Sequence, residues 1–481
     1  MNTQYQDTIV APATAAGTGA ISIIRVSGPE CFNIVDATLK LKRGTVSKSK
    51  AYTVHYGTVL NEDGTILDDV LVSVFKAPHS YTGEDSVEIS CHASSYILQE
   101  IISKLLGNGA RLAEAGEFTK RAFLNGKMDL AQAEAVADVI SSTTSASHRV
   151  AMNQLRGGFS SELASLREEL LNMASLLELE LDFSEEDVEF ANREDLTTLL
   201  DATKKHVDNL ADSFRLGNVI KNGVPVAIAG AVNAGKSTLL NALLGEERAI
   251  VSEIPGTTRD TIEETVNIGG ILFRFIDTAG IRETSEEVER LGIERTFNKI
   301  SQASVVLGVV DATLAEEGIV LRCEALMRLC DFKRQQLIIV LNKTDLLDQN
   351  RFNKIVIRMN NFVLSTDNQA SCVLLSAKSH RGVVELKKIL EESQSALFSQ
   401  DINATFVTNV RHFDALRKAS SALSSARSSL VRGLPQDLVA EDLRSAISSI
   451  NLILGTDLLD SQTISPETIL HHIFANHCVG K

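Results

Sequence analysis

A glycine-rich run near the middle of the chain, GAVNAGKS at 230–237, has the residue types and spacing of a phosphate-binding loop. It follows the apolar run PVAIAG and leads into STLLNALLG, and this strand–loop–helix context makes the pattern G-x-x-x-x-G-K-[ST] specific. Glycines let backbone N–H groups turn toward phosphates, and the helix N-terminus adds its dipole. We therefore expect Lys236 to reach the β- and γ-phosphates and Ser237 to bind Mg²⁺.

The motif NKTD at 342–345 indicates which base the site accepts. Asp345 can accept hydrogen bonds from both the N1–H and the exocyclic amine of guanine. Adenine does not offer this pair of donors, so ATP would leave a buried carboxylate unpaired. The run Ser376-Ala377-Lys378 can close the base pocket with a backbone amide. Together with the phosphate loop, these motifs predict a GTPase.

The residues that hydrolyse the nucleotide are less evident from the motifs. DTAG offers Asp277 for Mg²⁺ through water and the amide of Gly280 for the γ-phosphate. Where Ras-like proteins carry a water-orienting Gln, this chain has Ile281, so another group or a cation must act. GTTRD falls at switch I, where Thr258 can complete the Mg²⁺ shell. The acidic side chains near enough to orient the water are Glu283, Glu286, Glu287 and Glu289.

These motifs require elements that hold them in place. Short runs rich in Val, Ile and Tyr across 20–90 predict strands, with a hairpin turn at NEDG (61–64) and a helix over 93–109. Residues 224–378 alternate strand-like and helix-length segments, the pattern of a doubly wound α/β sheet. Helical stretches flank that region. One apolar helical stripe before it consists of Leu163, Leu166, Leu170, Leu177 and Leu181.

The simplest architecture is a multidomain chain in which an α/β domain is inserted into an all-α helical domain. The 481 residues have room for two to four domains. We expect an N-terminal α+β domain at 1–121, a helical domain at 122–221, the inserted α/β P-loop domain at 222–390 and a second helical part at 391–481.

The composition limits which binding partners and which cellular compartment fit this chain. The formal charge is −15, so most of the surface repels nucleic acid, and RNA would need a local patch or a partner's charge. The six cysteines are scattered without a C-x-x-C pair, which fits a reducing compartment. The N-terminus MNTQYQDTIVAP has neither a basic nor an apolar signal segment, and no apolar run is long enough to cross a bilayer. We expect a cytoplasmic protein that does not use a membrane.

Motifs inside and outside the α/β region resemble the MnmE (TrmE) family of tRNA-modifying GTPases, in the TrmE-Era-EngA-like superfamily. The resemblance covers essentially the whole chain and rests on GAVNAGKS, GTTRD, DTAG, NKTD, TGED (82–85), RAFLNGKMDLAQAEA (121–135) and the terminal CVGK. It implies an N-terminal folate-binding and dimerisation domain, a helical domain and an inserted Ras-like G domain. It also implies a homodimer that acts with the flavoprotein MnmG. The pair would add an aminomethyl or carboxymethylaminomethyl group at C5 of the wobble uridine (U34) of certain tRNAs while GTP is hydrolysed to GDP and Pi.

The resemblance also assigns residues to the nucleotide and its ions. K⁺ would stand in for an arginine finger, and Glu289 would be the acid that orients the attacking water, with Lys236 beside it in catalysis. The implied K⁺ ligands are Asn233, Ser252, Ile254 and Thr257, and the implied Mg²⁺ ligands are Ser237 and Thr258. The implied GTP contacts are Asn233, Ala234, Gly235, Lys236, Ser237, Thr238, Ser252, Glu253, Ile254, Pro255, Gly256, Thr257, Thr258, Asp277, Thr278, Ala279, Gly280, Asn342, Lys343, Asp345, Ser376, Ala377 and Lys378.

A second implied site takes 5-formyl-tetrahydrofolate through Arg25, Glu88, Lys127 and Lys481. A carboxylate such as Glu88 can pair with the amide and amine of a pterin, and a glutamate tail favours Arg or Lys. Cys478 resembles the family's C-terminal cysteine. It is either a thiol with a role in catalysis or a tail residue that only packs.

Two other functions fit parts of the sequence. A ribosome-assembly or signalling GTPase would bind protein or rRNA through its flanking domains, but no KH-like GxxG loop with basic flanks follows the α/β region. A scaffold that binds GTP without turnover would show equal and negligible hydrolysis in KCl and NaCl. The sequence does not indicate which tRNAs are served, or whether ammonia or glycine is the substrate.

Overall fold

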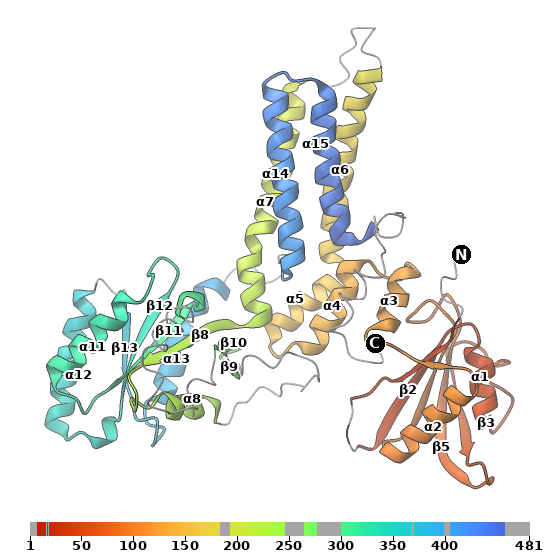
Figure 1. The fold of residues 1–481 in the computed structure, drawn as a ribbon, viewed down its shortest axis with the longest axis horizontal. Helices are drawn as coiled ribbons and strands as arrows, with labels where there is room; N and C mark the ends of the chain where they lie inside the picture. Colours follow the sequence, from red (N-terminus) through yellow and green to blue (C-terminus); the bar gives the residue numbers. More distant parts are fainter. Residues whose placement is uncertain are drawn as a thin grey trace. The chain divides into compact units, whose positions relative to one another are not determined.

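The computed structural model describes residues 7–15, 17, 19–182, 193–245, 264–276, 300–366, 370–398 and 405–456 (Figure 1). The chain divides into two compact units. The first draws on 1–137, 154–192 and 429–481, and the second on 138–153 and 193–428. Both segments of the second unit are therefore inserted in the sequence of the first. The domain boundaries after 121, 221 and 390 stay a prediction.

The first unit is built on a seven-stranded sheet with strand order β3-β4-β5-β6-β2-β1-β7. Neighbouring strands are antiparallel except β1 and β7, which run parallel. The helices α1 and α2 pack on one face, where their apolar side chains share a core with Val72, Val74 and Ile89 (Figure 1). The bounds are β1 Ile9–Pro12, β2 Ile21–Ser27, α1 Cys31–Thr38, β3 Leu39–Leu41, β4 Thr53–Leu60, β5 Ile66–Phe75, β6 Ser86–His92, α2 Ser95–Gly107 and β7 Arg111–Leu112.

The turn and the helix predicted for this region are both present. The N–H of Asn61 donates to the carbonyl of Thr65 at 2.8 Å, which closes the NEDG turn between β4 and β5, and Gly64 adopts a φ of 85° there. The helix predicted over 93–109 is α2. Helix α1 and the strands β1, β3 and β7 are additional, because elements this short carry too few residues to show a periodicity.

Longer helices complete the first unit. Helix α6 begins directly after Gly157, whose φ of 84° suits glycine, and α6 packs along α15. The side chain of Leu181 lies outside the described residues. The other leucines of the predicted stripe are buried, namely Leu163, Leu166, Leu170 and Leu177. The helices that contribute to this unit are α3 Glu117–Leu124, α4 Leu130–Ser141, α6 Gly158–Asp182 and α15 Gln436–Leu454.

The second unit is built on a six-stranded sheet with strand order β13-β12-β11-β8-β10-β9. Neighbouring strands are parallel except β9, which is antiparallel to β10. One apolar core lies between the sheet and α8 with α13, and a second lies between the opposite face and α11 with α12. The bounds are β8 Val224–Gly230, α8 Lys236–Leu244, β9 Glu264–Ile268, β10 Ile271–Phe275, β11 Val305–Asp311, α11 Glu316–Arg328, β12 Gln336–Asn342, η3 Thr344–Leu346, α12 Gln349–Ser365, β13 Ala370–Leu374 and α13 Val383–Phe398.

The sheet is doubly wound, and its strands β8, β10, β11, β12 and β13 are the five predicted from apolar runs. Strand β9 is an addition at the edge of the sheet. The remaining helices of this unit are α5 Ser145–Leu155, α7 Arg193–Asn222 and α14 Val410–Val431. The predicted class is confirmed: an α+β domain, an all-α helical domain and an inserted α/β P-loop domain. Within the described part of the chain, no helix has the length and apolar character needed to cross a bilayer.

Candidate functional site

The phosphate loop joins β8 to α8 and has a glycine near each end. Gly230 has a φ of 151°, and a Cβ there would lie 2.3 Å from the carbonyl oxygen of Val309 on β11. Gly235 has a φ of 97°, and a Cβ there would lie 2.1 Å from Nδ2 of Asn342. Both positions therefore require glycine. The close approach presses the loop against β11 and the end of β12.

Lys236 curls back over this loop. Its Nζ donates to the carbonyl oxygens of Gly230 at 3.0 Å and Ala231 at 2.9 Å, and burial lowers the pKa of Lys236. Ser237 follows in the first turn of α8, where the leading N–H groups have no partner within the helix and favour an anion. Asn233 has a left-handed φ of 62° and an exposed side chain. The loop thus presents an ammonium group, helix N–H groups and an amide oxygen to a polyphosphate.

One buried side chain links the phosphate loop to the predicted base pocket. Asn342, at the end of β12, is 3% exposed. Its Nδ2 donates to the carbonyl oxygen of Ala234 at 2.9 Å, and its Oδ1 accepts the N–H of Ala377 at 3.0 Å. The amide therefore joins three segments that the sequence assigns to GTP: the phosphate loop, NKTD and the SAK run.

Replacing Asn342 with Ala should destabilise the second unit by about 2–4 kcal/mol, because it leaves a buried carbonyl and a buried N–H without partners. The same change should weaken GDP binding, since two loops of the site lose their link. Denaturant unfolding followed by circular dichroism measures the first effect, and calorimetric titration with GDP measures the second. The control is Asn353→Ala on α12, where an exposed Asn accepts one bond from Gln349. Equal stability of the two variants would contradict the role given to Asn342.

The residues predicted to bind the base lie where β11 and β12 end. Lys343 has a left-handed φ of 69°, and its Nζ lies 2.6 Å from Oδ2 of Asp311, the last residue of β11. Burial acts to raise the pKa of Asp311, but the bonds and charge of Lys343 and the bonds from Thr313 outweigh it and hold the pKa below its usual value. Asp345 lies in the short helix η3 with an exposed side chain. This carboxylate is therefore presented to a ligand at the edge of the sheet.

A second candidate site lies on the sheet of the first unit. Arg25 on β2 stands opposite Glu88 on β6, and its Nε and Nη2 donate to Oε1 of Glu88 at 3.0 and 2.8 Å. The guanidinium carbon lies 5.1 Å from the ring centre of Tyr81 and 5.6 Å from that of Phe118, within cation–π range. Two residues assigned to folate from the sequence thus meet, together with two rings that the sequence did not single out.

Lys127 is held against the loop that carries Tyr81. Its Nζ donates to the carbonyl oxygen of Pro78 at 3.0 Å. A Cβ at Gly83 would lie 3.3 Å from Cγ of Lys127, and Gly83 has a φ of 80°. The loop between β5 and β6 therefore contacts both Lys127 and Arg25.

Several of the predicted residues lie outside the described part of the chain. They are the switch I segment 252–258, the DTAG motif 277–280, Glu289, Cys478 and Lys481. Their assignments to GTP, K⁺, Mg²⁺ and folate stay predictions.

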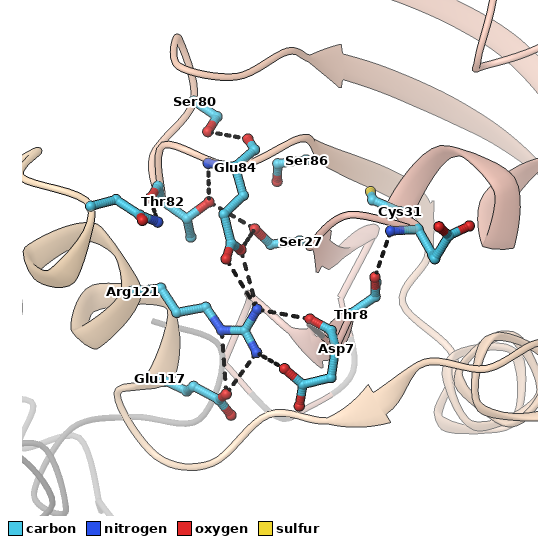
Figure 2. Close-up of polar contacts among 12 residues, drawn as sticks. Asp7, Thr8, Ser27, Cys31, Ser80, Thr82, Glu84, Ser86, Glu117 and Arg121 are labelled. Carbon is cyan, nitrogen blue, oxygen red and sulfur yellow. Dashed lines mark hydrogen bonds and ion pairs between the residues drawn. The ribbon is translucent and has the colours of Figure 1, made fainter. Parts of the chain in front are cut away.

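Beside the second candidate site, Arg121 on α3 is fully buried among three carboxylates (Figure 2). Its Nη2 donates to Asp7 at 2.8 Å and Glu117 at 3.0 Å, and its Nη1 donates to Glu84 at 3.2 Å. Arg111 on β7 also binds Asp7 and Glu117. Burial acts to raise the pKa of Asp7 and of Glu117, but the bonds and charges of Arg111 and Arg121 outweigh it, and both pKa values fall below the usual 3.8 and 4.5.

This cluster predicts that the first unit loses stability in acid. A carboxyl whose pKa is depressed by folding stabilises the fold above its unfolded pKa, and that contribution is lost as pH falls through the folded pKa. From pH 7 to pH 3.5 the melting temperature of the first unit should fall by roughly 5 °C or more. All five tyrosines lie within residues 5–96 and the chain has no Trp, so tyrosine fluorescence reports on this unit. Asp7→Asn should be less stable at pH 7 and flatter with pH, and a profile as steep as that of the unchanged chain would contradict this assignment.

The doubly wound sheet, the glycine-rich loop at its edge and the NKTD carboxylate beside it define the class of protein, a P-loop GTPase, which is a GTP hydrolase. Two family models match the chain. Residues 8–127 match the GTP-binding protein TrmE N-terminus, and residues 130–478 match the MnmE helical domain. The chain belongs to the MnmE family of tRNA modification GTPases.

Curated relatives extend this similarity along the whole chain, and each is named tRNA modification GTPase MnmE. The relative from Bacteroides thetaiotaomicron is 50% identical over 478 residues, which cover 99% of this chain and 100% of the relative. The relatives from Flavobacterium johnsoniae and Christiangramia forsetii are 51% and 52% identical, over 99% of this chain and 99% and 100% of their own. Among solved structures, the G domain of the T. maritima FeoB iron transporter is 24% identical over 36% of this chain and 99% of its own. Its TM-score is 0.24.

Proposed function

We propose that the chain hydrolyses GTP to GDP and Pi in a potassium-activated cycle and, with the flavoprotein MnmG, modifies U34 of certain tRNAs at C5. The observation that carries the nucleotide part is the link through Asn342, which joins the phosphate loop to the base loops. Membership of a family named for tRNA modification supports the tRNA part, and potassium, MnmG and the C5 chemistry follow from the motif resemblance. The charge of −15 favours tRNA contact through a local patch or through the partner. A tRNA substrate also favours a cytoplasmic location for the protein. The proposed active form is a homodimer.

In this proposal the residues of the second unit bind and orient GTP. Lys236 exchanges its loop carbonyls for the β- and γ-phosphate oxygens, and Asp345 accepts the two guanine donors. Ser237 and Thr258 suit Mg²⁺ because both offer hydroxyl oxygens. Glu289 would hold the attacking water.

Potassium fits a polar side chain that the phosphate loop exposes, that of Asn233. Asn233 offers a neutral amide oxygen on an exposed side chain, and its backbone is left-handed, a conformation that Asn tolerates well. When bound, K⁺ supplies positive charge against the negative charge that develops on the phosphates. The other proposed ligands are Ser252, Ile254 and Thr257.

A reduced folate fits the pair formed by Arg25 and Glu88. Both described bonds from Arg25 to Glu88 end on Oε1, and the Glu88 side chain is 27% exposed. Its Oε2 can therefore accept from the amide and amine of a pterin. Lys127, together with Lys481, suits a glutamate tail.

The proposal is tested by reconstitution. The full chain is combined with the flavoprotein partner, unmodified tRNA, GTP, a reduced folate, K⁺ and either ammonium or glycine, and nucleosides are then resolved by mass spectrometry. We expect U34 modified at C5, and no product when GTP is left out. The Bacteroides thetaiotaomicron relative with its own partner is the matched positive control. Product from the relative and none from this chain would overturn the proposal.

A further inference from the structure

Helix α3 is buried almost along its whole length, although half of its residues are polar. Glu117, Lys120 and Arg121 are 3%, 9% and 0% exposed. Buried ion clusters seldom stabilise a fold more than apolar side chains of the same size would. We therefore ask which segments of the chain the ion pairs of Arg121 hold in place.

Arg121 holds the loop between β5 and β6. Its Nη1 lies 3.2 and 3.3 Å from the two carboxylate oxygens of Glu84, and Figure 2 shows that carboxylate pointing at the guanidinium. The hydroxyl of Ser27 donates to Oε2 of Glu84 at 2.9 Å and pairs with the hydroxyl of Thr82 at 2.7 Å. The TGED motif, for which the sequence offered no role, is thus the point where α3 and β2 hold this loop.

The same loop carries the ring that lies on Arg25. The hydroxyl of Tyr81 pairs with that of Thr119 on α3 at 2.8 Å, and burial raises the pKa of Tyr81. Asn125, which caps α3, donates to the carbonyl oxygen of Thr82 at 2.8 Å. Three residues on or just after α3 therefore fix the loop, and the loop and α3 together place two aromatic rings against the Arg25 guanidinium.

We propose that Arg121, acting through Glu84, is a positioning residue for the reduced-folate site. It holds the loop Ser80–Glu84 against α3, so that Tyr81 packs on Arg25 and the Arg25–Glu88 pair keeps one orientation before the ligand arrives. The proposal rests on the folate site put forward above. A preorganised site avoids the cost of ordering side chains on binding, so loosening the loop weakens affinity without removing any group that touches the ligand.

Arg111 provides a control for the loss of ion pairs in this cluster. Arg111 binds Asp7 and Glu117, the same carboxylates that Arg121 binds. Among the described residues its bonds do not reach the loop Ser80–Glu84. Arg111→Gln should therefore lower the stability of the first unit and leave the loop in place, whereas Glu84→Gln should release the loop.

The experiment measures the dissociation constant of 5-formyl-tetrahydrofolate for the full chain by calorimetry, at a temperature below the melting temperature of each variant. We expect Glu84→Gln and Thr119→Val to weaken binding by about 5- to 10-fold each, and Arg111→Gln to stay within about twofold. Arg121→Lys, which keeps the charge, should bind more tightly than Arg121→Met. Tyrosine fluorescence gives the melting temperature of the first unit, and steady-state GTP hydrolysis, which belongs to the second unit, should be unchanged in all of them.

The outcomes separate this proposal from the folate site itself. If the unchanged chain binds and Arg25→Ala does not, while Glu84→Gln and Thr119→Val bind normally, the positioning role is overturned and the folate site stands. If Arg111→Gln weakens binding as much as Glu84→Gln, the effect is one of stability, and the role is again overturned. If the unchanged chain does not bind, both proposals fail. Should Glu84→Gln not fold, the comparison of Arg121→Lys with Arg121→Met decides, together with Thr119→Val, which removes one hydroxyl from a separate contact between α3 and the same loop.

Discussion

A chain with Asp345→Asn should lose GTP as a substrate and accept xanthosine triphosphate in its place. In the proposed site the carboxylate of Asp345 accepts from N1–H and from the exocyclic amine of guanine, whereas an amide would face that amine with a donor. Xanthine has a carbonyl where guanine has the amine, so the amide can donate to it and still accept from N1–H. Polar sites of this kind discriminate strongly, and kcat/KM for GTP should fall by about 100-fold or more.

The measurement is kcat/KM for both nucleotides with the unchanged chain and the variant. Asp348→Asn is the matched control, since Asp348 is an exposed Asp three residues along that caps α12 by accepting from the N–H of Arg351. This control should keep its preference for GTP. A variant at Asp345 that still prefers GTP would contradict the position given to the base.

GTP turnover should be roughly 10- to 100-fold faster in KCl than in NaCl at equal ionic strength. The chain has Ile281 where Ras-like proteins carry a water-orienting Gln. In the proposed mechanism, a cation bound against the phosphates stabilises the transition state instead. Sodium is smaller and would sit too far from some of the oxygens that potassium reaches. Binding of GTP itself should differ much less between the two salts.

Asn233→Gly tests whether this loop residue holds the ion. Gly rather than Ala is the right replacement, because the φ of 62° at this position would strain Ala. Hydrolysis by the variant should be slow and nearly equal in both salts. Val232→Ala, at a 68% exposed neighbour in the same loop, should keep the response to potassium. A variant at Asn233 that still responds fully would rule this residue out as a ligand.

The phosphate loop between β8 and α8 could be predicted from the sequence because its motif is local. A phosphate loop requires glycines and a lysine within eight residues, and the strand before it shows as an apolar run. NKTD was recognised as a base-binding motif, yet Asn342 turned out to be a buried link whose partners, Ala234 and Ala377, lie 108 and 35 residues away. A motif identifies the residues of a site and does not show which of them hold the loops together.

The contacts around the second candidate site could not be predicted from the sequence, because they join residues that lie far apart in the chain. Arg121 meets Asp7 across 114 residues and Glu84 across 37, and no spacing rule connects them. Arg25 and Glu88 were paired only through the family resemblance, and the rings of Tyr81 and Phe118 reach Arg25 from a loop and a helix. Helix α3 would normally be read as a surface helix, since its charged residues give no sign that it is buried.

The most direct test is the state of U34 in tRNA from cells that lack this chain and receive it back from a plasmid. Mass spectrometry of tRNA nucleosides should find U34 unmodified at C5 without the chain and modified once the unchanged chain is supplied. Lys236→Ala, which removes the ammonium proposed to bind the phosphates, should leave U34 unmodified even when the protein accumulates to the same level. Full modification in cells without the chain, or with the Lys236 variant alone, would contradict the proposal that GTP hydrolysis by this protein drives tRNA modification.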